Sequence, residues 1–200
     1  LTTNAIFIKR TCGIGVLPGD MAIDYGCTGP VLRGSGVDYD LRRDGEERYT
    51  DLYDGYAFEV IVERDGHYPK DHDYPPVPAE AVLGDCWHRF YVRMLEVMQA
   101  IDLVRQAMDR YSTASGDYGE PIKLATKLPK GEVYLETESP RGQMGFYLVS
   151  DGSSIPWRVR ARSSSFCNLS VTEEISRGVP IADIPAIVGS LDVVMGEIDR

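Results

Sequence analysis

Cysteine and histidine could hold a metal in this chain, but their spacing argues against a metal site. The four cysteines are isolated and none forms a C-x-x-C pair: Cys12, Cys27, Cys86 and Cys167. Structural zinc and iron–sulfur clusters usually take clustered ligands. An even number of cysteines would permit disulfides, but nothing in the sequence indicates secretion. We therefore expect reduced and mostly buried thiols.

The three histidines also give little indication of a metal site or a catalytic site. His67 and His72 lie in a segment broken by prolines, which is a poor preformed metal site, so we interpret them as solvated loop residues. His88 lies near the start of a predicted helix and is expected to pack or cap there. Gly152-Ser153-Ser154 does not match the G-x-S-x-G pattern of a nucleophile elbow, and a hydrolase is not indicated.

Two glycine pairs resemble dinucleotide-binding loops only superficially. Gly13-x-Gly15 and Gly34-x-Gly36 do not complete G-x-G-x-x-G, because Pro18 and Tyr39 stand where the third glycine would be. Neither pair lies between a predicted strand and a predicted helix, as such a loop must. We interpret these residues as turn glycines and expect no NADH binding by this chain.

Composition excludes several classes of function. A length of 200 residues fits one domain with a real core, and 43% of the residues are hydrophobic. The net charge of −10 argues against a nucleic-acid surface and against a polybasic lipid-binding patch. No apolar run reaches the length of about 18 residues that a membrane-spanning helix needs. Membrane contact is therefore expected only through partner subunits.

The strongest predicted element is a helix over residues 85–111. Apolar residues recur there at steps of three and four, with no Gly or Pro: Phe90, Met94, Val97, Met98, Ile101, Val104, Met108 and Tyr111. A helix of this length would span about 40 Å. It needs a bundle of similar length to pack against, which residues 1–84 do not supply, so we expect further helices outside this sequence.

Three strands are predicted in the second half. Residues 132–138 alternate Val133, Leu135 and Thr137 with acidic residues, and residues 144–149 and 157–162 complete an antiparallel meander. Arg158, Arg160 and Arg162 share one face of the third strand. We expect them to pair with glutamates of the adjacent hairpin strand (Glu132, Glu136 and Glu138). The alternatives are acidic groups of a neighbouring subunit or an approach to an iron–sulfur cluster.

The remaining predicted elements are short. Residues 20–26 favour a helix that ends at Gly26, and residues 57–62 favour a strand. Ser170-x-x-Glu173 is typical of a capping box for a helix that ends at Gly178. Asp183 is expected to cap a last helix through Val188. The prediction is an α+β fold with a long bundle helix, a small antiparallel β-meander and short C-terminal helices.

The last eleven residues, 190–200, carry the most specific pattern of the chain. Large subunits of nickel–iron hydrogenases often end in Asp-Pro-Cys-x-x-Cys-x-Asp-Arg. On that pattern Asp192 and Asp199-Arg200 match, whereas Val194 and Glu197 replace the two cysteines. Valine cannot ligate a soft metal, so the tail resembles a hydrogenase large subunit whose metal ligands are gone.

Residues 4–43, 84–93, 129–152 and 177–189 resemble the same family. In particular, residues 129–134 and 140–152 look like its late β-hairpin, with Pro140-Arg141-Gly142 as the turn. The combination resembles the family of the hydrogenase-like D subunit of respiratory complex I, the NADH-quinone oxidoreductase. Other members also have a first half with a His-rich loop and a Tyr that meet the quinone headgroup. The resemblance implies that residues 1–200 are the C-terminal portion of one hydrogenase-like domain, with its N-terminal half absent.

The resemblance also implies a function. Members of this family belong to a proton-translocating NADH:quinone oxidoreductase and form part of its quinone cavity, where the metal cavity once was. The resemblance places Asp192 near the buried end of that cavity, where an acid could relay protons to a quinone. Val194, Phe166 and Leu169 are expected to line it as apolar walls. The alternative is that Asp192 only anchors the C-terminus.

Cofactors and partners follow from the same resemblance. Quinone is the expected substrate, no metal is expected in this chain, and an iron–sulfur cluster is expected on an adjacent subunit. Expected partners are the iron–sulfur B subunit and the C subunit of the complex, at the cytoplasmic face of the inner membrane, with no nucleic acid. One alternative is a non-catalytic assembly scaffold. Another is a relative of membrane-bound hydrogenases, against which Val194 and Glu197 argue.

Overall fold

The computed structural model describes residues 1–63, 75–114, 116, 119 and 127–199, so His67 and His72 lie outside the described residues. The first half contains α1 (Ala5–Thr11), α2 (Gly19–Asp24), α3 (Pro30–Arg33), α4 (Leu41–Asp44), α5 (Glu47–Thr50), η1 (Asp51–Tyr53) and α6 (Cys86–Thr113). The second half contains β1 (Gly131–Ser139), β2 (Gly142–Ser150), β3 (Arg158–Arg162), α7 (Ser164–Ser170), α8 (Thr172–Ile175), η2 (Ile181–Asp183), α9 (Ile184–Leu191) and α10 (Met195–Ile198).

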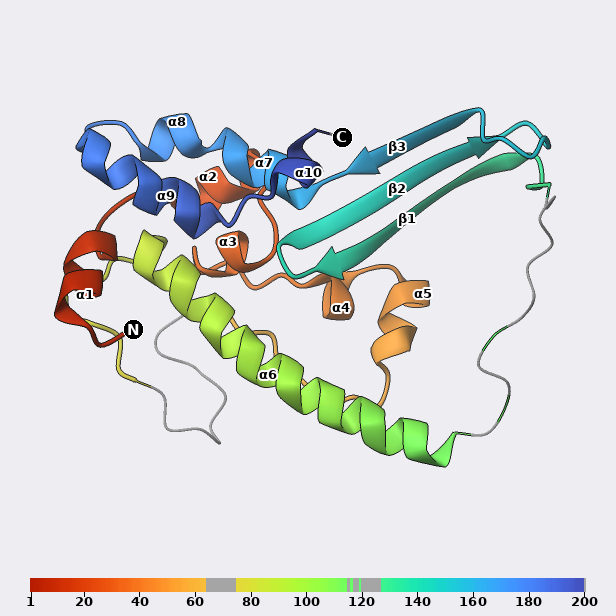
Figure 1. Ribbon diagram of the computed structural model, residues 1–200, viewed down its shortest axis with the longest axis horizontal. Helices are drawn as coiled ribbons and strands as arrows, with labels where there is room; N and C mark the ends of the chain where they lie inside the picture. Colours follow the sequence, from red (N-terminus) through yellow and green to blue (C-terminus); the bar gives the residue numbers. More distant parts are fainter. Residues whose placement is uncertain (64–74, 115, 117–118, 120–126, 200) are drawn as a thin grey trace.

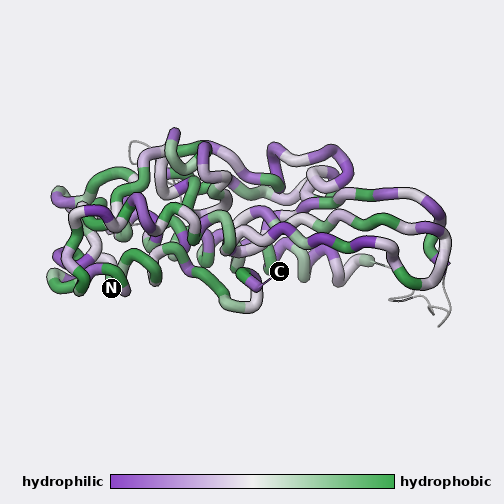
Figure 2. Tube along the Cα trace, turned by 90° about the horizontal axis from the view of Figure 1, so that it is seen from above, coloured by the Kyte–Doolittle hydropathy of each residue, from purple (hydrophilic) through white to green (hydrophobic). Residues whose placement is uncertain are grey.

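The helices form one body, from which the sheet extends as an arm. Figure 1 shows α6 crossing beneath the short helices, while the antiparallel sheet, of order β1-β2-β3, projects away from α7–α10. Along the arm hydrophobic and hydrophilic residues alternate, as Figure 2 shows by colour. The predicted α+β class, the long helix, the three strands and the helix before Gly26 are confirmed.

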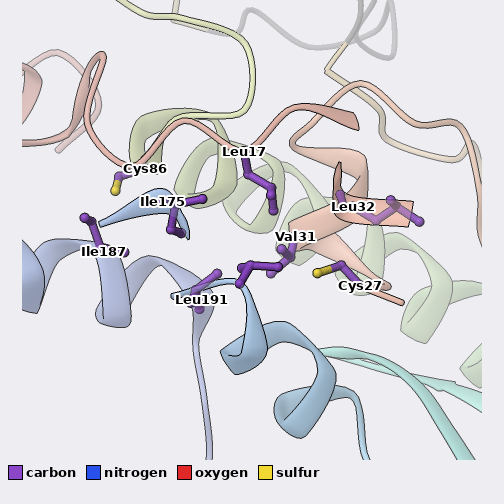
Figure 3. Packing of buried hydrophobic residues seen from close by; sticks show 10 residues of the cluster. Leu17, Cys27, Val31, Leu32, Cys86, Ile175, Ile187 and Leu191 are labelled. Carbon is purple, nitrogen blue, oxygen red and sulfur yellow. The ribbon is translucent and has the colours of Figure 1, made fainter. Parts of the chain in front are cut away.

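The core lies where the helical segments meet. Leu17, Val31, Leu32, Cys86, Ile187 and Leu191 bury their side chains together with Cys27 and Ile175 (Figure 3). These residues come from the N-terminal segment, α6, α8 and α9, so the two ends of the chain share one core. Burial of aliphatic side chains of this size contributes roughly 1.5–3 kcal/mol each.

Helix α6 buries its first three turns and exposes an apolar face beyond them. Trp87, Tyr91, Val92 and Leu95 are almost completely buried. The predicted apolar face behaves differently, because its members after Phe90 are 43–78% exposed: Met94, Val97, Met98, Ile101, Val104, Met108 and Tyr111. We call these seven residues the α6 stripe. The described residues do not cover the stripe, which is an unusually long apolar surface for a helix in contact with water.

Asp85 begins α6 as its N-cap. Its carboxylate accepts hydrogen bonds from the backbone N–H groups of Gly13, Val82 and His88, at 2.8–2.9 Å. The His88 ring Nδ1 lies 2.9 Å from the same carboxylate, and the ring is buried, as predicted for a packing residue. Burial alone would raise the pKa of Asp85, but the hydrogen bonds from His88, Val82 and Gly13 outweigh it and lower the pKa below 3.8.

Arg89, one turn later, is fully buried and joins three segments of the chain. Its guanidinium donates to the carbonyl of Gly84, to the carbonyl of Gly15 at 2.8 Å and to the Ser190 hydroxyl at 3.0 Å. Gly84 has a left-handed backbone, and a Cβ there would lie 2.2 Å from the Leu17 carbonyl oxygen. Only glycine permits this close approach, which brings the N-terminal segment against the start of α6.

The predicted strand over residues 57–62 is wrong. The segment has no strand partner among the described residues, and side-chain amides of α6 satisfy part of its backbone instead. The Gln106 amide accepts from the Ala57 N–H and donates to the Ala57 carbonyl, both at 2.8 Å, and Gln99 donates to the Glu59 carbonyl. Propensity indicates an extended backbone but cannot tell which groups will satisfy it.

Two further predictions need correction. Ser170 does not cap a helix: it ends α7, which begins six residues earlier with Ser163 as its N-cap, and its hydroxyl donates to the Cys167 carbonyl. The last predicted helix does follow Asp183, as α9, but that side chain makes no capping hydrogen bond and the helix continues to Leu191.

The arginines of β3 are not adjacent to the glutamates of β1, because β2 lies between the two strands. In register, Arg160 lies opposite Tyr147. Arg162 donates to the carbonyls of Gln143 and Gly26, at 3.0 and 3.1 Å. The predicted pairing is therefore wrong, and Arg162 instead ties the base of the sheet to the N-terminal segment.

Arg89→Met should destabilise the chain strongly. The change leaves the carbonyls of Gly84 and Gly15 and the Ser190 hydroxyl without their buried donor, so we expect a loss of about 3 kcal/mol or more. The measurement is the free energy of unfolding of the purified chain in urea. Arg105→Met on the exposed part of α6 is the matched control and should change it by less than about 0.5 kcal/mol. Equal effects would contradict the role given to Arg89.

Asp85→Asn should make the free energy of unfolding less dependent on pH in acid. A carboxyl with a lowered native pKa stabilises the fold above its unfolded value of 3.8 and loses that contribution as pH falls through the native pKa. Wild type should therefore lose stability more steeply than the variant below about pH 4. Urea unfolding at a series of pH values checks this, and parallel curves would show that Asp85 is not the group responsible.

Candidate functional site

Asp192 lies at a backbone reversal immediately after α9. Its φ of 53° and ψ of 48° are left-handed, and among the described residues it is the only non-glycine with a positive φ. Such a backbone costs an L-residue roughly 1–2 kcal/mol, although Asp and Asn tolerate it best. The carboxylate is 42% exposed and points toward α6 and the β1–β2 turn.

Two arginines flank Asp192. Arg141, in the turn between β1 and β2, donates from Nε to the Asp192 carbonyl at 2.9 Å, and this nitrogen lies 3.4 Å from the carboxylate. Arg93, on α6, brings its Nε to 3.8 Å from the same carboxylate oxygen. The sequence prediction of Asp192 missed both. The sequence does contain an indication of Arg93, because this charged residue interrupts the predicted apolar face of the helix between Phe90 and Met94.

Hydrogen bonds hold the guanidinium of Arg93 in place but leave one of its donors, Nε, without a partner among the described residues. Its Nη1 donates to the carbonyls of Ser190 at 2.6 Å and Arg89 at 3.0 Å. Its Nε is shielded from solvent and has no hydrogen-bond partner among the described residues. Burial lowers the pKa of Arg93 to about 10, against the opposing effect of Asp192. A cation in this state favours negative charge or an electron-rich oxygen nearby.

Backbone contact fixes the position of Arg141. A Cβ on Gly29 would lie 2.5 Å from the Gly142 Cα, so the β1–β2 turn packs directly on the segment before α3. The Gln143 N–H donates to the Thr28 hydroxyl at 3.0 Å, and Asn168 of α7 donates to the Arg141 carbonyl at 3.2 Å. The base of the sheet therefore reaches Asp192 through the docked β1–β2 turn.

Two cavities meet at Asp192. The first, of about 500 Å³, lies between α1, α6 and α9, and we call it the apolar cavity. Its walls include Phe7, Phe90, Met94 and Ala186. The second, of about 470 Å³, is the charged cavity, whose walls include Arg33, Arg42, Glu96 and Glu138. Both cavities share Arg93, Val97 and Asp192.

The other predicted site residues lie elsewhere. Val194, Phe166 and Leu169 line neither cavity. The Val194 N–H contacts the Ser165 hydroxyl at 3.4 Å, which brings Val194 beside α7, and Phe166 of that helix is 61% exposed. The structure thus separates Asp192 from this α7–α10 group, and the lining role of the three apolar residues stays a prediction.

The described part of the chain contains no group of three or more His, Cys, Asp or Glu side chains placed to hold a metal ion. The four cysteines are free thiols, of which Cys27 and Cys86 are buried. Within the described ranges, no helix combines the length and the apolar composition needed to cross a membrane.

Comparison with known proteins identifies the family. The model of the respiratory-chain NADH dehydrogenase 49 kDa subunit matches residues 1–124 and 120–200. The D subunit of the NADH-quinone oxidoreductase of Chlorobium chlorochromatii is 44% identical over the whole chain, which covers 46% of that relative. The corresponding D subunit of Geotalea uraniireducens is 40% identical, with 52% of it covered.

A solved structure agrees with these relatives. A chain of the membrane-bound sulfane sulfur reductase, an archaeal respiratory membrane complex, matches the whole chain with a TM-score of 0.78 and 35% identity, over 49% of its own length. The chain spans about half the length of the relatives it matches. On this evidence, the chain belongs to the family of the 49 kDa subunit of respiratory-chain NADH dehydrogenase.

Proposed function

We propose that this chain forms part of the quinone-binding cavity of a proton-translocating NADH:quinone oxidoreductase, next to the subunit that carries the terminal iron–sulfur cluster. The observation that carries the proposal is Asp192, held left-handed between Arg93 and Arg141 where the two cavities meet. The relatives, which are D subunits of NADH-quinone oxidoreductases, support the reaction class.

The chemistry of a quinone suits this arrangement. Its headgroup is a flat apolar ring with two carbonyl oxygens, and reduction adds two electrons and two protons to those oxygens. The apolar cavity has the size of a small-molecule site, with aromatic and aliphatic walls and few polar groups. Arg93 and Arg141 would stabilise negative charge on a reduced oxygen, and Asp192 would pass a proton to it.

The remaining roles follow from the same proposal. Val194, two residues after Asp192, and Phe166 and Leu169 of α7 line neither of the two cavities, and their place is a further apolar wall of the quinone site on the side of α7. Electrons arrive from the iron–sulfur cluster of the B subunit, with the C subunit as a further neighbour. The complex works at the cytoplasmic face of the inner membrane, where this chain meets the membrane through its partners.

A second candidate is an assembly scaffold without chemistry of its own. The exposed α6 stripe favours it, because a long apolar helix face is a surface for other protein elements. The sulfane sulfur reductase, a structural neighbour, also suggests that this fold serves complexes with other acceptors. Substitution of Asp192 separates these candidates, since a scaffold does not need its charge.

Asp192→Asn should lower quinone reductase activity while the complex still assembles. Asparagine tolerates the left-handed backbone but cannot accept and release a proton as a carboxylate does. A loss of about 100-fold in kcat matches the usual contribution of a general acid or base. Steady-state turnover of the complete, purified complex is the measurement, with Asp109→Asn on the exposed face of α6 as control. Normal turnover in Asp192→Asn would favour the scaffold.

Val194→Ala should weaken the binding of a quinone-site inhibitor. Removing two methyl-sized groups from an apolar wall costs about 1.6 kcal/mol, which is roughly a tenfold increase in Kd. Inhibition curves of the assembled complex measure it, and Val82→Ala, which shortens a half-exposed side chain before α6, is the control. An unchanged curve would remove Val194 from the cavity wall.

A further inference from the structure

The α6 stripe has the spacing of a contact between two helices. After Met94, its members follow at steps of three, four, three, four and three residues: Val97, Ile101, Val104, Met108 and Tyr111. Met98, the seventh member, lies beside this row. The alternation of three and four averages 3.5 residues, which is the repeat that keeps apolar side chains facing a second helix running alongside. The spacing therefore indicates a helix as the partner of the stripe.

The same row begins inside the protein. Phe90 and Trp87 continue it towards the start of α6, at further steps of four and three. Trp87 is completely buried, and the ring of Phe90 packs edge-on against Phe7 of α1, with the ring centroids 4.8 Å apart. The chain thus covers the first part of the row with its own side chains. From Met94 onward the described residues leave the row exposed.

A different side of α6 is already covered. The segment before residue 60 lies along it, where the Gln106 amide bonds both backbone groups of Ala57. Arg110 donates to the Asp54 carbonyl at 3.1 Å, and its Cζ lies 3.9 Å from the centre of the Tyr56 ring. The chain therefore packs on the polar side of the helix. Burial of the apolar side would remove more apolar surface from water, so that side is left for an element outside this chain.

The length of the stripe sets the length of its partner. From Met94 to Tyr111 the helix rises about 25 Å, so the partner helix needs roughly 18 residues. Among the residues that the structure describes, the next longest helix is α9, with eight residues, which is too short to lie along the whole stripe. The relatives contain more chain: this one covers 46% of the Chlorobium chlorochromatii D subunit and 49% of the sulfane sulfur reductase chain.

The stripe also forms part of the apolar cavity. Met94 and Val97 belong to the stripe and line that cavity, yet they are 46% and 53% exposed. The cavity is therefore open to solvent along the start of the stripe. A helix that lies on the stripe closes this side and adds its own side chains to a cavity that Arg93 and Asp192 also line.

We propose that the α6 stripe binds one amphipathic helix from the half of the subunit that this chain does not match, and that this helix forms the outer wall of the apolar cavity. The two helices cross at about 20°, with their apolar side chains interleaved. Arg105, which follows Val104 and is 72% exposed, has the flanking position where paired helices usually carry charge. Only the statement that the closed cavity holds a quinone rests on the proposed function.

Binding is tested with two polypeptides, the complete chain and the half of the Chlorobium chlorochromatii D subunit that it does not match, produced together. We expect an equimolar complex. Ile101→Glu and Val104→Glu should each weaken it at least about 30-fold, because each places an unpaired charge at the centre of the contact. Ile155→Glu, a matched change at a residue 75% exposed in the loop between β2 and β3, should leave the affinity unchanged.

Three outcomes would overturn the proposal. The first is the absence of a complex. The second is a complex that neither stripe variant weakens. The third is a homodimer of the chain that Ile101→Glu dissociates, since the stripe would then bind a second copy. Sedimentation of the chain alone and of the mixture distinguishes these outcomes.

Methionine oxidation shows where the partner helix lies. Met94, Met98 and Met108 of the stripe are 44–66% exposed, and Met195 on α10 is 80% exposed. Dilute hydrogen peroxide should convert all four thioethers to sulfoxides in the free chain, with water as the other product. In the complex the three stripe residues should react at least about tenfold more slowly, whereas Met195, the internal control, keeps its rate. Unchanged oxidation of Met98 and Met108 would overturn the helix contact, and unchanged oxidation of Met94 alone would overturn the cavity wall.

Failure of the proposed function would give a different result. Neither affinity nor methionine oxidation involves a quinone. If the helix binds and protects Met94 but the assembled complex reduces no quinone, the proposed function is refuted and the helix contact stands. If Ile101→Glu leaves both assembly and quinone reduction intact, only the helix contact is refuted.

Discussion

The structure depends on a cation buried at the start of α6. Arg89 gives its hydrogen bonds to two carbonyls and a hydroxyl, and these lie on the N-terminal segment, the start of α6 and the end of α9. Arg93, one turn further along α6, holds the same end of α9 through the Ser190 carbonyl. Asp192 follows that anchored end directly. The site is therefore an extension of the contact that closes the core, and its geometry cannot shift without disturbing that contact.

Local patterns predicted the regular elements well and the site only in part. Helix α6 and the three strands follow from spacing that neighbouring residues set among themselves. Asp192 came from the resemblance of the tail, which says where a residue belongs but not what it touches. Arg93 and Arg141 were missed because they reach Asp192 from distant segments. The prediction of a strand over residues 57–62 failed for the same reason. Side chains of α6, and not a neighbouring strand, form part of the backbone hydrogen bonds of this segment.

The net charge of the chain does not reveal which charged residues are buried. The chain is acidic, with a net charge of −10, yet its most deeply buried charged side chains include Arg33 and Arg89. Arginine suits these positions because its guanidinium bonds several oxygens at once and keeps its charge. The surplus of Asp and Glu lies mainly on the surface, whereas arginines organise both cavities. Net charge thus argued against nucleic-acid partners but could not indicate the electrostatics of the site.

The left-handed backbone at Asp192 has an evolutionary consequence. Codons for Asn and Gly each differ from those for Asp by a single base, and these two residues are the ones that such a backbone accepts most readily. Mutation can therefore erase the carboxylate without straining the backbone, and glycine would even relieve strain. The demand for an acid at this position comes from the side chain, because the carboxylate lies between Arg93 and Arg141. Wherever an acid persists at this place in a lineage, selection has kept its charge beside these two arginines.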